Sequence, residues 1–403
     1  MAVGVFVLAA SGRILGLYEL FVLAAGASGL LVAGAVTVLV GRVNLDARRT
    51  LRPARLHAGG ESRVELAVRN TGRRPSPVVT IRDSLAPAPP VAGAVAASQE
   101  GRRHARFLLA PLGPGQEDTA SYRLPAERRG VYVIGPLTGT RRDPFGLWSK
   151  VRPIAPAVEL TVYPAIEPVA APPHSRGDDP TSGAPRPASV GNTGDDLYGL
   201  RPYEVGDDLR RVHWPSTART GDLMVRQLEL PWQGRLTVLL DVRAPAHTGS
   251  TFEIAVSAAA SVVVASWRAG ALVRLATTDG NDSGFAAGHT HFEAVMEHLA
   301  VVGRGRPEGL ETVVAGLRRA GNGGALTVVT TTAAPGGDLE LLAGLQGRFD
   351  HLTLVVVEHP RRPRPAVPDV THRAGATVVR VPAGSRLAPS WDRAWGSALG
   401  VGR

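Results

Sequence analysis

The stretch "LTVLLDV", residues 236–242, decides the fold of the second half of the chain. It is a nearly continuous apolar run that ends at Asp241, as expected of a parallel strand buried on both faces of a sheet. Helical and strand patterns alternate after it, beginning with a helix over "FEIAVSAAASVVVASWRAG" that Gly270 ends. This alternation predicts a doubly wound α/β sheet over residues 235–403. Ligand sites in such sheets lie at the carboxyl ends of strands, so Asp241 is a candidate functional residue.

Residues 58–165 show a different pattern, in which short strands are separated by Gly, Pro and Asn turn signals. In "RVELAVRN", residues 63–70, apolar and polar side chains alternate with the period of a half-buried strand. Six or seven such strands without a helical stretch predict a β-sandwich. "RRDPFGLW", residues 141–148, is predicted to form a turn. Phe145 and Trp148 either have a functional role or, as we favour, fill a core or an inter-domain seam.

The N-terminus is predicted to lie in a membrane. Residues 20–40 form a run of 21 residues without a charge, and at about 1.5 Å per residue this crosses a hydrocarbon core of about 30 Å. Residues 2–18 are apolar enough to form a first helix, so we expect residues 1–40 to hold one transmembrane helix or a helical hairpin with a turn near Tyr18 and Glu19. The rival interpretation, a cleaved signal peptide, lacks the basic region that precedes such peptides.

Charge and composition limit the kinds of site and binding partner that the chain can have. The net charge is +10, and the absence of cysteine excludes disulfides, thiol catalysis and cysteine-based zinc sites. Arginines crowd residues 41–57, a predicted basic juxtamembrane segment, and this places the soluble domains on the cytoplasmic side of the cell membrane. Such a segment also attracts anionic lipid headgroups. We expect no nucleic-acid partner, because the chain shows neither an aromatic RNA-binding signature nor a helix-turn-helix pattern.

Residues 166–193 are too rich in Pro, Gly and Ser to bury a core and are predicted to form a linker. A dense polar segment, residues 194–234, follows it and contains "RPYEVGDDLRRVHWPSTAR" at 201–219. One interpretation pairs Asp207 or Asp208 with His213 for acid/base or metal chemistry. The other, which we favour, is a clamp.

In the clamp, Gly206-Asp207-Asp208 turns the chain and caps a short helical turn, "LRRVHW", that Pro215 limits. The arginines then pair with the carboxylates, and the two aromatic side chains bury their apolar bodies. No nucleophile elbow, phosphate-binding glycine loop or HExxH spacing accompanies the segment, so no catalytic residue is assigned. The clamp residues are Arg201, Tyr203, Gly206, Asp207, Asp208, Arg210, His213, Trp214 and Arg219.

These motifs resemble the DUF58 family, whose members are membrane-anchored and carry a von Willebrand factor A-like domain. The resemblance covers essentially the whole chain and rests most specifically on residues 201–219. It implies a partnership with a MoxR-type AAA+ ATPase and a role in assembling or remodelling other proteins, in company with transglutaminase-like membrane proteins. The other motifs that carry it are "NTGRRPSP" at 70–77, "RRGVYVIGP" at 128–136, "DPFGLW" at 143–148 and "VLLDV" at 238–242.

The chain departs from the A-type pattern at the metal site. Metal-binding A-type domains have Asp-x-Ser-x-Ser after the first strand, whereas this sequence reads Asp241-Val242-Arg243-Ala244-Pro245. Both hydroxyls are missing, and Arg243 places a cation where a metal would be repelled. The hydroxyls of Thr330, Thr331 and Thr332 end a later strand, but without an acidic partner. We therefore expect no metal or other cofactor, with Asp241 a weak metal candidate at most, and we take Asp241 and Arg243 as partner-binding candidates.

Three functions remain open on the sequence. The first is a non-enzymatic, membrane-anchored interaction protein acting with an AAA+ ATPase and other membrane proteins. The second is a metal-dependent hydrolase built on Asp207, Asp208, His213 and Asp241. The third is a scaffold that binds a lipid surface through its basic region.

Overall fold

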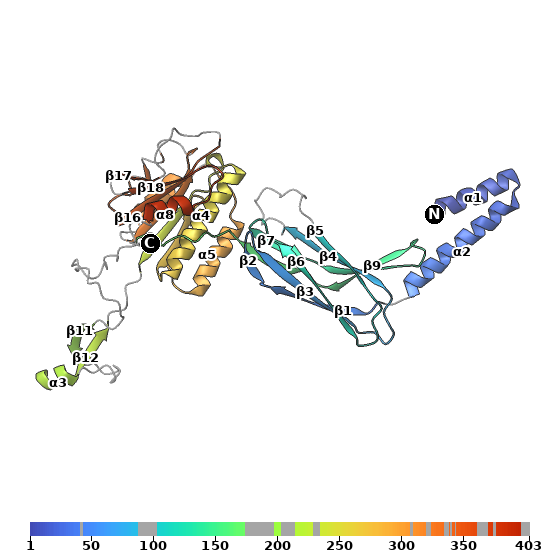
Figure 1. Cartoon of the computed structure of the whole chain (residues 1–403), viewed down its shortest axis with the longest axis horizontal. Coiled ribbons are helices and arrows are strands. Elements are labelled where there is room, and N and C mark those ends of the chain that lie inside the picture. Colours follow the sequence, from blue (N-terminus) through green and yellow to red (C-terminus); the bar gives the residue numbers. More distant parts are fainter. Residues whose placement is uncertain are drawn as a thin grey trace. The chain divides into compact units, whose positions relative to one another are not determined.

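The computed structural model describes residues 1–40, 43–87, 103–173, 197–202, 214–228, 234–306, 309–319, 324–333, 338, 341–342, 344–360, 370–373 and 376–395. The chain divides into two compact units. The first holds Met1–Ala165 together with Met296–Val301, and the second holds Ile166–Val295 and Val302–Arg403. Figure 1 shows the elements of each.

Two apolar helices begin the first unit. Helix α1 (Ala2–Leu15) is joined through Gly16 and Leu17 to α2 (Tyr18–Val40), so a helical hairpin forms with its turn just before the predicted position. Helix α2 is long and apolar enough to cross a membrane, whereas α1 is shorter than a span. The buried helix α4 (Gly249–Arg268) of the second unit passes the same test by composition, but it packs against strands as a core helix does.

The first unit also contains two sheets. The smaller is antiparallel, with the order β1 (Leu45–Arg52), β3 (Glu61–Asn70) and β6 (Glu117–Pro125). The larger has the order β2-β10-β7-β4-β8-β9, with β5 paired to β4. Its strands are β2 (Arg55–His57), β4 (Val79–Pro87), β5 (Arg103–Leu109), β7 (Gly130–Ile134), β8 (Leu137–Arg142), β9 (Ser149–Ala155) and β10 (Val158–Tyr163).

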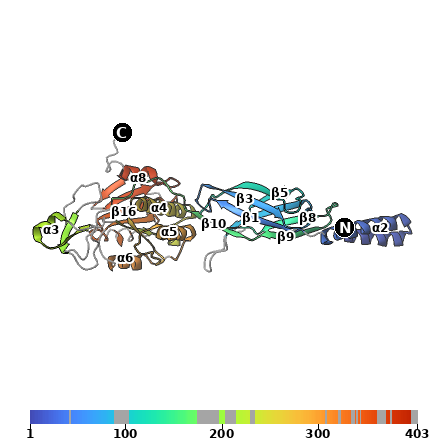
Figure 2. The same ribbon diagram turned by 90° about the horizontal axis from the view of Figure 1, so that it is seen from below.

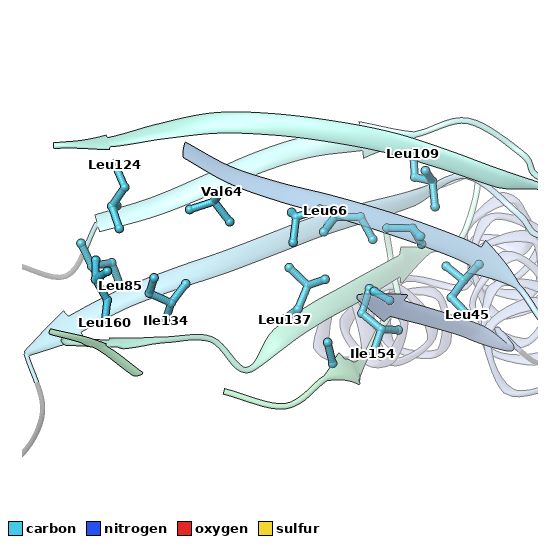
Figure 3. Packing of buried hydrophobic residues seen from close by; sticks show 14 of the residues in the cluster. Leu45, Val64, Leu66, Leu85, Leu109, Leu124, Ile134, Leu137, Ile154 and Leu160 are labelled. Atoms are coloured by element: carbon cyan, nitrogen blue, oxygen red, sulfur yellow. The ribbon is translucent and has the colours of Figure 1, made fainter. Parts of the chain in front are cut away.

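One hydrophobic cluster joins the two sheets. Strand β3 buries every second side chain, including Val64 and Leu66, as its sequence pattern predicts. These side chains lie in the same cluster as Ile134, Leu137 and Leu160 of the larger sheet, and Figure 3 shows them packed between the strands. Each fully buried side chain of this kind contributes about 1.5–3 kcal/mol to folding.

The β-strand region begins earlier than the sequence suggested. Strands β1 and β2 lie inside residues 41–57, which were predicted as a juxtamembrane segment. Leu45 and Ala47 are buried on alternate positions of β1, but the density of arginine obscured this period. One of those arginines, Arg49, is itself buried.

Arg49 and Asp83 form a closed ion pair inside this unit. The guanidinium donates to both carboxylate oxygens, at 2.6 and 3.1 Å, and to the backbone oxygens of Ile134 and Pro156 at 3.0 and 2.9 Å. The hydroxyl of Tyr122 donates to Asp83 Oδ2 at 2.8 Å. Because Arg49 lies on β1 and Asp83 on β4, the pair ties the smaller sheet to the larger one.

The second unit contains a six-stranded sheet with the order β14-β13-β15-β16-β18-β17, parallel except for β17 at one edge. The alternation predicted after residue 235 is therefore present. Strand β17 was not predicted, because its four residues, "VTHR", show no apolar run. The strands are β13 (Arg235–Leu240), β14 (Leu272–Thr277), β15 (Ala325–Thr331), β16 (His351–Val357), β17 (Val370–Arg373) and β18 (Ala376–Val381).

Helices cover both faces of this sheet. Helix α4 begins at a capping box formed by Thr248 and Thr251 and ends before Gly270, whose φ of +80° confirms the predicted glycine at its end. Helices α5 (His289–Val301), α6 (Leu310–Arg319) and α8 (Ala388–Trp395) follow. Figure 2 shows α6 and α8 on opposite sides of the sheet.

The first residues of the predicted linker are packed rather than free. Glu167 accepts backbone hydrogen bonds from Leu387 at 3.0 Å and Ala388 at 2.8 Å, where α8 begins. The indole of Trp391, fully buried on α8, donates to the backbone oxygen of Ala170 at 2.8 Å. A carboxylate at a helix N-terminus is bound by its unpaired N–H groups, so residues 166–173 belong to the second unit. Residues 174–193 lie outside the described part of the chain.

Candidate functional site

The site lies where the connections of the parallel sheet diverge. From β13 the chain passes to β14 on one side, and then to β15 on the other side of β13. In sheets with this order, the loops after the two central strands leave in opposite directions and open a crevice at the carboxyl edge. Asp241 directly follows β13 and therefore lies at this point, as predicted.

The carboxylate of Asp241 is saturated by donors of the protein. The guanidinium of Arg243 binds both oxygens, Nε to Oδ1 at 2.9 Å and Nη2 to Oδ2 at 2.8 Å, and its backbone N–H reaches Oδ1 at 3.1 Å. The hydroxyl of Thr330, at the end of β15, donates to Oδ2 at 2.9 Å. Thr278 Oγ1, after β14, lies 3.4 Å from Oδ1. Three neighbouring strands thus converge on one carboxylate.

A second carboxylate completes the cluster. Asp338 accepts from Arg243 Nη2 at 2.7 Å, so the guanidinium bridges two acids. Asp338 was missed in the sequence, where Thr330 was judged to lack an acidic partner. The signal was present nonetheless: an acid follows β15 by a few residues, and β15 is the neighbour of β13 in the sheet.

The electrostatics of the cluster follow from this pairing. Burial alone would raise the pKa of Asp241, but the hydrogen bonds and charge of Arg243, together with Thr330, hold it below its ordinary value. The pKa of Arg243 is raised, chiefly by its bonds to Asp241, against the effect of burial. The guanidinium and the Asp241 carboxylate are therefore both charged at neutral pH.

His247 lies beneath the cluster and was also missed. It is 4% exposed, and its Nε2 lies 2.7 Å from the backbone oxygen of Asp241. Its ring packs edge-on against Phe252. Burial lowers the pKa of His247 despite the nearby Asp241 charge, so the ring is neutral and Nε2–H donates to the carbonyl.

The structure brings Asp241 and Arg243 together, and it buries both. Their exposed fractions are 1% and 6%, too small for either to form much of a direct contact surface. They link the end of β13 to Thr330 of β15 and to Asp338.

The clamp segment is described only at its ends. Strand β11 (Leu197–Pro202), which carries Arg201, pairs with β12 (Met224–Leu228). Helix α3 (Trp214–Thr220) lies between them in the sequence. Tyr203, Gly206, Asp207, Asp208, Arg210 and His213 lie outside the described residues.

One prediction for this segment was wrong. Trp214 was expected to bury its ring, yet it is 66% exposed, because the short helix "WPSTART" has no apolar face to pack beside it. The predicted helical turn "LRRVHW" lies outside the described residues except for Trp214, and Pro215, which was expected to limit it, lies within α3. Arg219, in the last turn of α3, is exposed as well.

Comparison with known proteins finds a match to one protein family. Residues 199–374 match the family described as "Protein of unknown function DUF58". The chain is also 24% identical, over 260 residues, to the "Uncharacterized protein YeaD" of Bacillus subtilis (strain 168). That match covers 64% of this chain and 62% of YeaD, so the chain spans less than two thirds of this relative.

Likenesses to solved structures are slight. A β-glucosidase from Listeria innocua is similar at 15% identity and a TM-score of 0.21, over 29% of this chain and 16% of that chain. The CARDB domain of a Pyrococcus furiosus protein is similar at 16% identity and a TM-score of 0.19, over 29% of this chain and 89% of that chain. Such scores support no conclusion about fold or function.

Proposed function

We propose that this chain, which carries the DUF58 family region at residues 199–374, is a membrane-anchored, non-enzymatic interaction protein. Its α/β unit serves as a degenerate von Willebrand factor A-like domain, and its two facing sheets form a β-sandwich on the same chain. It acts with a MoxR-type AAA+ ATPase in the assembly or remodelling of other proteins.

The observation that carries this proposal is the guanidinium at the centre of the Asp241 cluster. An A-type metal site surrounds a divalent cation with carboxylate and hydroxyl oxygens. The same types of oxygen meet here, but the carboxylates of Asp241 and Asp338 bind the guanidinium of Arg243, and the hydroxyl of Thr330 donates to Asp241. We infer that an internal cation fixes the carboxyl edge of the sheet permanently, without a metal.

Electrostatics supports this inference. A divalent ion about 4 Å from the guanidinium would be repelled by about 8 kcal/mol at an effective dielectric constant near 20. Arg243 would have to leave both carboxylates before a metal bound to them. The hydrolase alternative built on Asp207, Asp208, His213 and Asp241 loses support for the same reason, because Asp241 already receives its full set of donors.

The membrane anchor is supported by α2, the long apolar helix that precedes the sheets. The excess of arginine after Val40 favours the cytoplasmic side for the remainder of the chain. An AAA+ ATPase of the cytoplasm would then reach the α/β unit.

Affinity purification from detergent-solubilised membranes tests the proposal. The parent chain should recover an AAA+ ATPase under mild crosslinking, and Arg243→Gln should lose it, because two unneutralised acids then repel the loops after β13 and β15. Arg243→Lys, which keeps the charge but not the planar fork, should retain part of the binding.

Arg274→Gln is the matched control. Arg274 also binds an aspartate through Nε and Nη2, but its partner, Asp282, lies on a more exposed loop of the same unit. Recovery of the ATPase with this variant and its loss with Arg243→Gln, at equal expression and with both variants folded at the temperature of the assay, would support the site. Equal recovery with both variants would remove the cluster from the interaction, and failure of the parent to recover any ATPase would overturn the partnership.

A further inference from the structure

We propose that the turn between β8 and β9, residues 143–148, inserts its aromatic side chains into the interfacial layer of the membrane beside α2. The inference rests on the proposed anchoring of the chain by α2. It goes further, because it assigns a second, non-helical contact with lipid and names the residues that make it.

The turn is attached to α2 itself. The indole of Trp148 donates from Nε1 to the backbone oxygen of Leu31 at 3.0 Å. At Gly34, one helical turn further on, an added Cβ would lie 3.0 Å from Asp143 Oδ2 and 3.1 Å from Trp148 Cδ1. Glycine is thus the residue that lets the turn approach the helix this closely.

The attachment lies within the apolar part of the helix. Gly34 precedes Val40, the last residue of α2, by six residues, which is about 9 Å along the helix axis. The whole helix has 23 residues, about 35 Å in length, against a hydrocarbon core of about 30 Å. If α2 is centred on the core, Gly34 and Leu31 lie about 6 Å and about 11 Å inside its nearer boundary. A turn held there lies in the outer part of the apolar layer, close to the depth of about 5–10 Å that interfacial apolar groups reach.

The chemistry of the turn suits this depth. Its one acid, Asp143, is 5% exposed, and its carboxylate accepts the backbone N–H groups of Phe145 at 3.0 Å and Trp148 at 2.5 Å. The charge is thus turned inward, while Phe145 is 53% and Trp148 46% exposed. Aromatic side chains with an exposed apolar body are enriched at membrane interfaces.

Basic side chains flank the aromatic turn on both strands. They are Arg141, Arg142, Lys150 and Arg152. Cations placed beside an aromatic tip bind the phosphates of the headgroups while the rings enter the apolar boundary. A lipid surface matches this combination of charge and exposed aromatic rings, together with the attachment to a span, better than a protein surface does.

The cysteine-free sequence allows a direct test in the full-length chain. Phe145→Cys is labelled with nitrobenzoxadiazole and reconstituted into vesicles of phosphatidylcholine and phosphatidylglycerol. Lipids carrying a nitroxide near the headgroup or near the end of the acyl chain then quench the probe according to its depth. Val32→Cys, 63% exposed on α2, reports the span, and Arg128→Cys, on the exposed turn after β6, reports the aqueous side.

We expect the probe at position 145 to show a blue-shifted emission. The shallow nitroxide should quench this emission more than the deep nitroxide does, and neither should quench the probe at position 128. Quenching of the probe at position 32 without quenching at position 145 would overturn the insertion of the turn and leave the anchor intact. That result would point to a protein partner for Phe145 and Trp148. Absence of quenching at position 32 would overturn the anchor, and the insertion with it.

Discussion

Each unit of the protein contains a buried arginine–aspartate pair, and the two pairs share their geometry but differ in their surroundings. In both, the guanidinium binds both oxygens of one carboxylate. The side chains of Arg49 and Asp83 are 1% and 0% exposed, and the remaining donors of Arg49 end on backbone carbonyls. Arg243 instead forms an ion pair with a second acid as well, Asp338, whose side chain is 16% exposed.

The difference separates a structural pair from a candidate functional one. Arg49 and Asp83 lie between the strands of two sheets in the interior of the first unit. Arg243 and Asp241 lie at the carboxyl edge of a parallel sheet, where the connections diverge and ligands bind in this architecture. A buried ion pair alone therefore indicates little about function, whereas its position in the topology does.

The largest expected loss of stability follows from breaking the Arg49–Asp83 ion pair. Arg49→Met leaves Asp83 as an uncompensated buried charge and should destabilise the first unit by about 3–5 kcal/mol. Urea unfolding followed by hydrogen exchange of β3 and β4 amides measures this. The double variant Arg49→Met, Asp83→Leu should recover most of the loss, and a single variant as stable as the parent would show that the pair is not needed.

A smaller loss of stability is expected when the Asp241 cluster is broken. Arg243→Met leaves Asp241 with Thr330, Thr278 and a backbone N–H, and the more exposed Asp338 turns to water. We expect a loss of about 1.5–3 kcal/mol, the value of hydrogen bonds to charged groups. Faster amide exchange should be confined to the loops after β13 and β15. If the sheet strands exchange faster as well, the cluster is a core element like the Arg49 pair.

The two units should also differ in the sign of their pH dependence. The pKa values of Asp241 and His247 are lowered in the folded state, so the unfolded chain takes up more protons on acidification. The second unit therefore loses stability as the pH falls below about 6.5 for the histidine, and again below about 4 for the aspartate.

In the first unit, burial and the neighbouring Asp83 raise the pKa of Tyr122, so that unit loses stability as the pH rises above about 10. Thermal unfolding across this range, with amide exchange to distinguish the units, checks both directions. His247→Gln should reduce the acid loss of the second unit, and Tyr122→Phe the alkaline loss of the first. Acid sensitivity unchanged in His247→Gln would exclude the histidine as its source.

The comparison also shows what the sequence could predict. The run at 236–242 was enough to locate β13 and Asp241, because a strand buried on both faces needs a continuous apolar run. Asp338 escaped notice because its partner is distant in sequence and becomes adjacent only through strand order. Strand β1 escaped because a buried Arg49 breaks the alternation that would have revealed it. A side chain whose burial depends on a remote partner leaves no local pattern.

The hydrogen bonds between Glu167 and the start of α8 have a consequence for the synthesis and folding of the protein. The carboxylate and the backbone N–H groups that it binds are separated by 220 and 221 residues. During synthesis the segment after β10 emerges long before its partner helix, and it must wait for nearly the last part of the described chain to leave the ribosome. A nonsense mutation before Leu387 would therefore remove α8 and also release residues 166–173 at the opposite end of the unit's sequence.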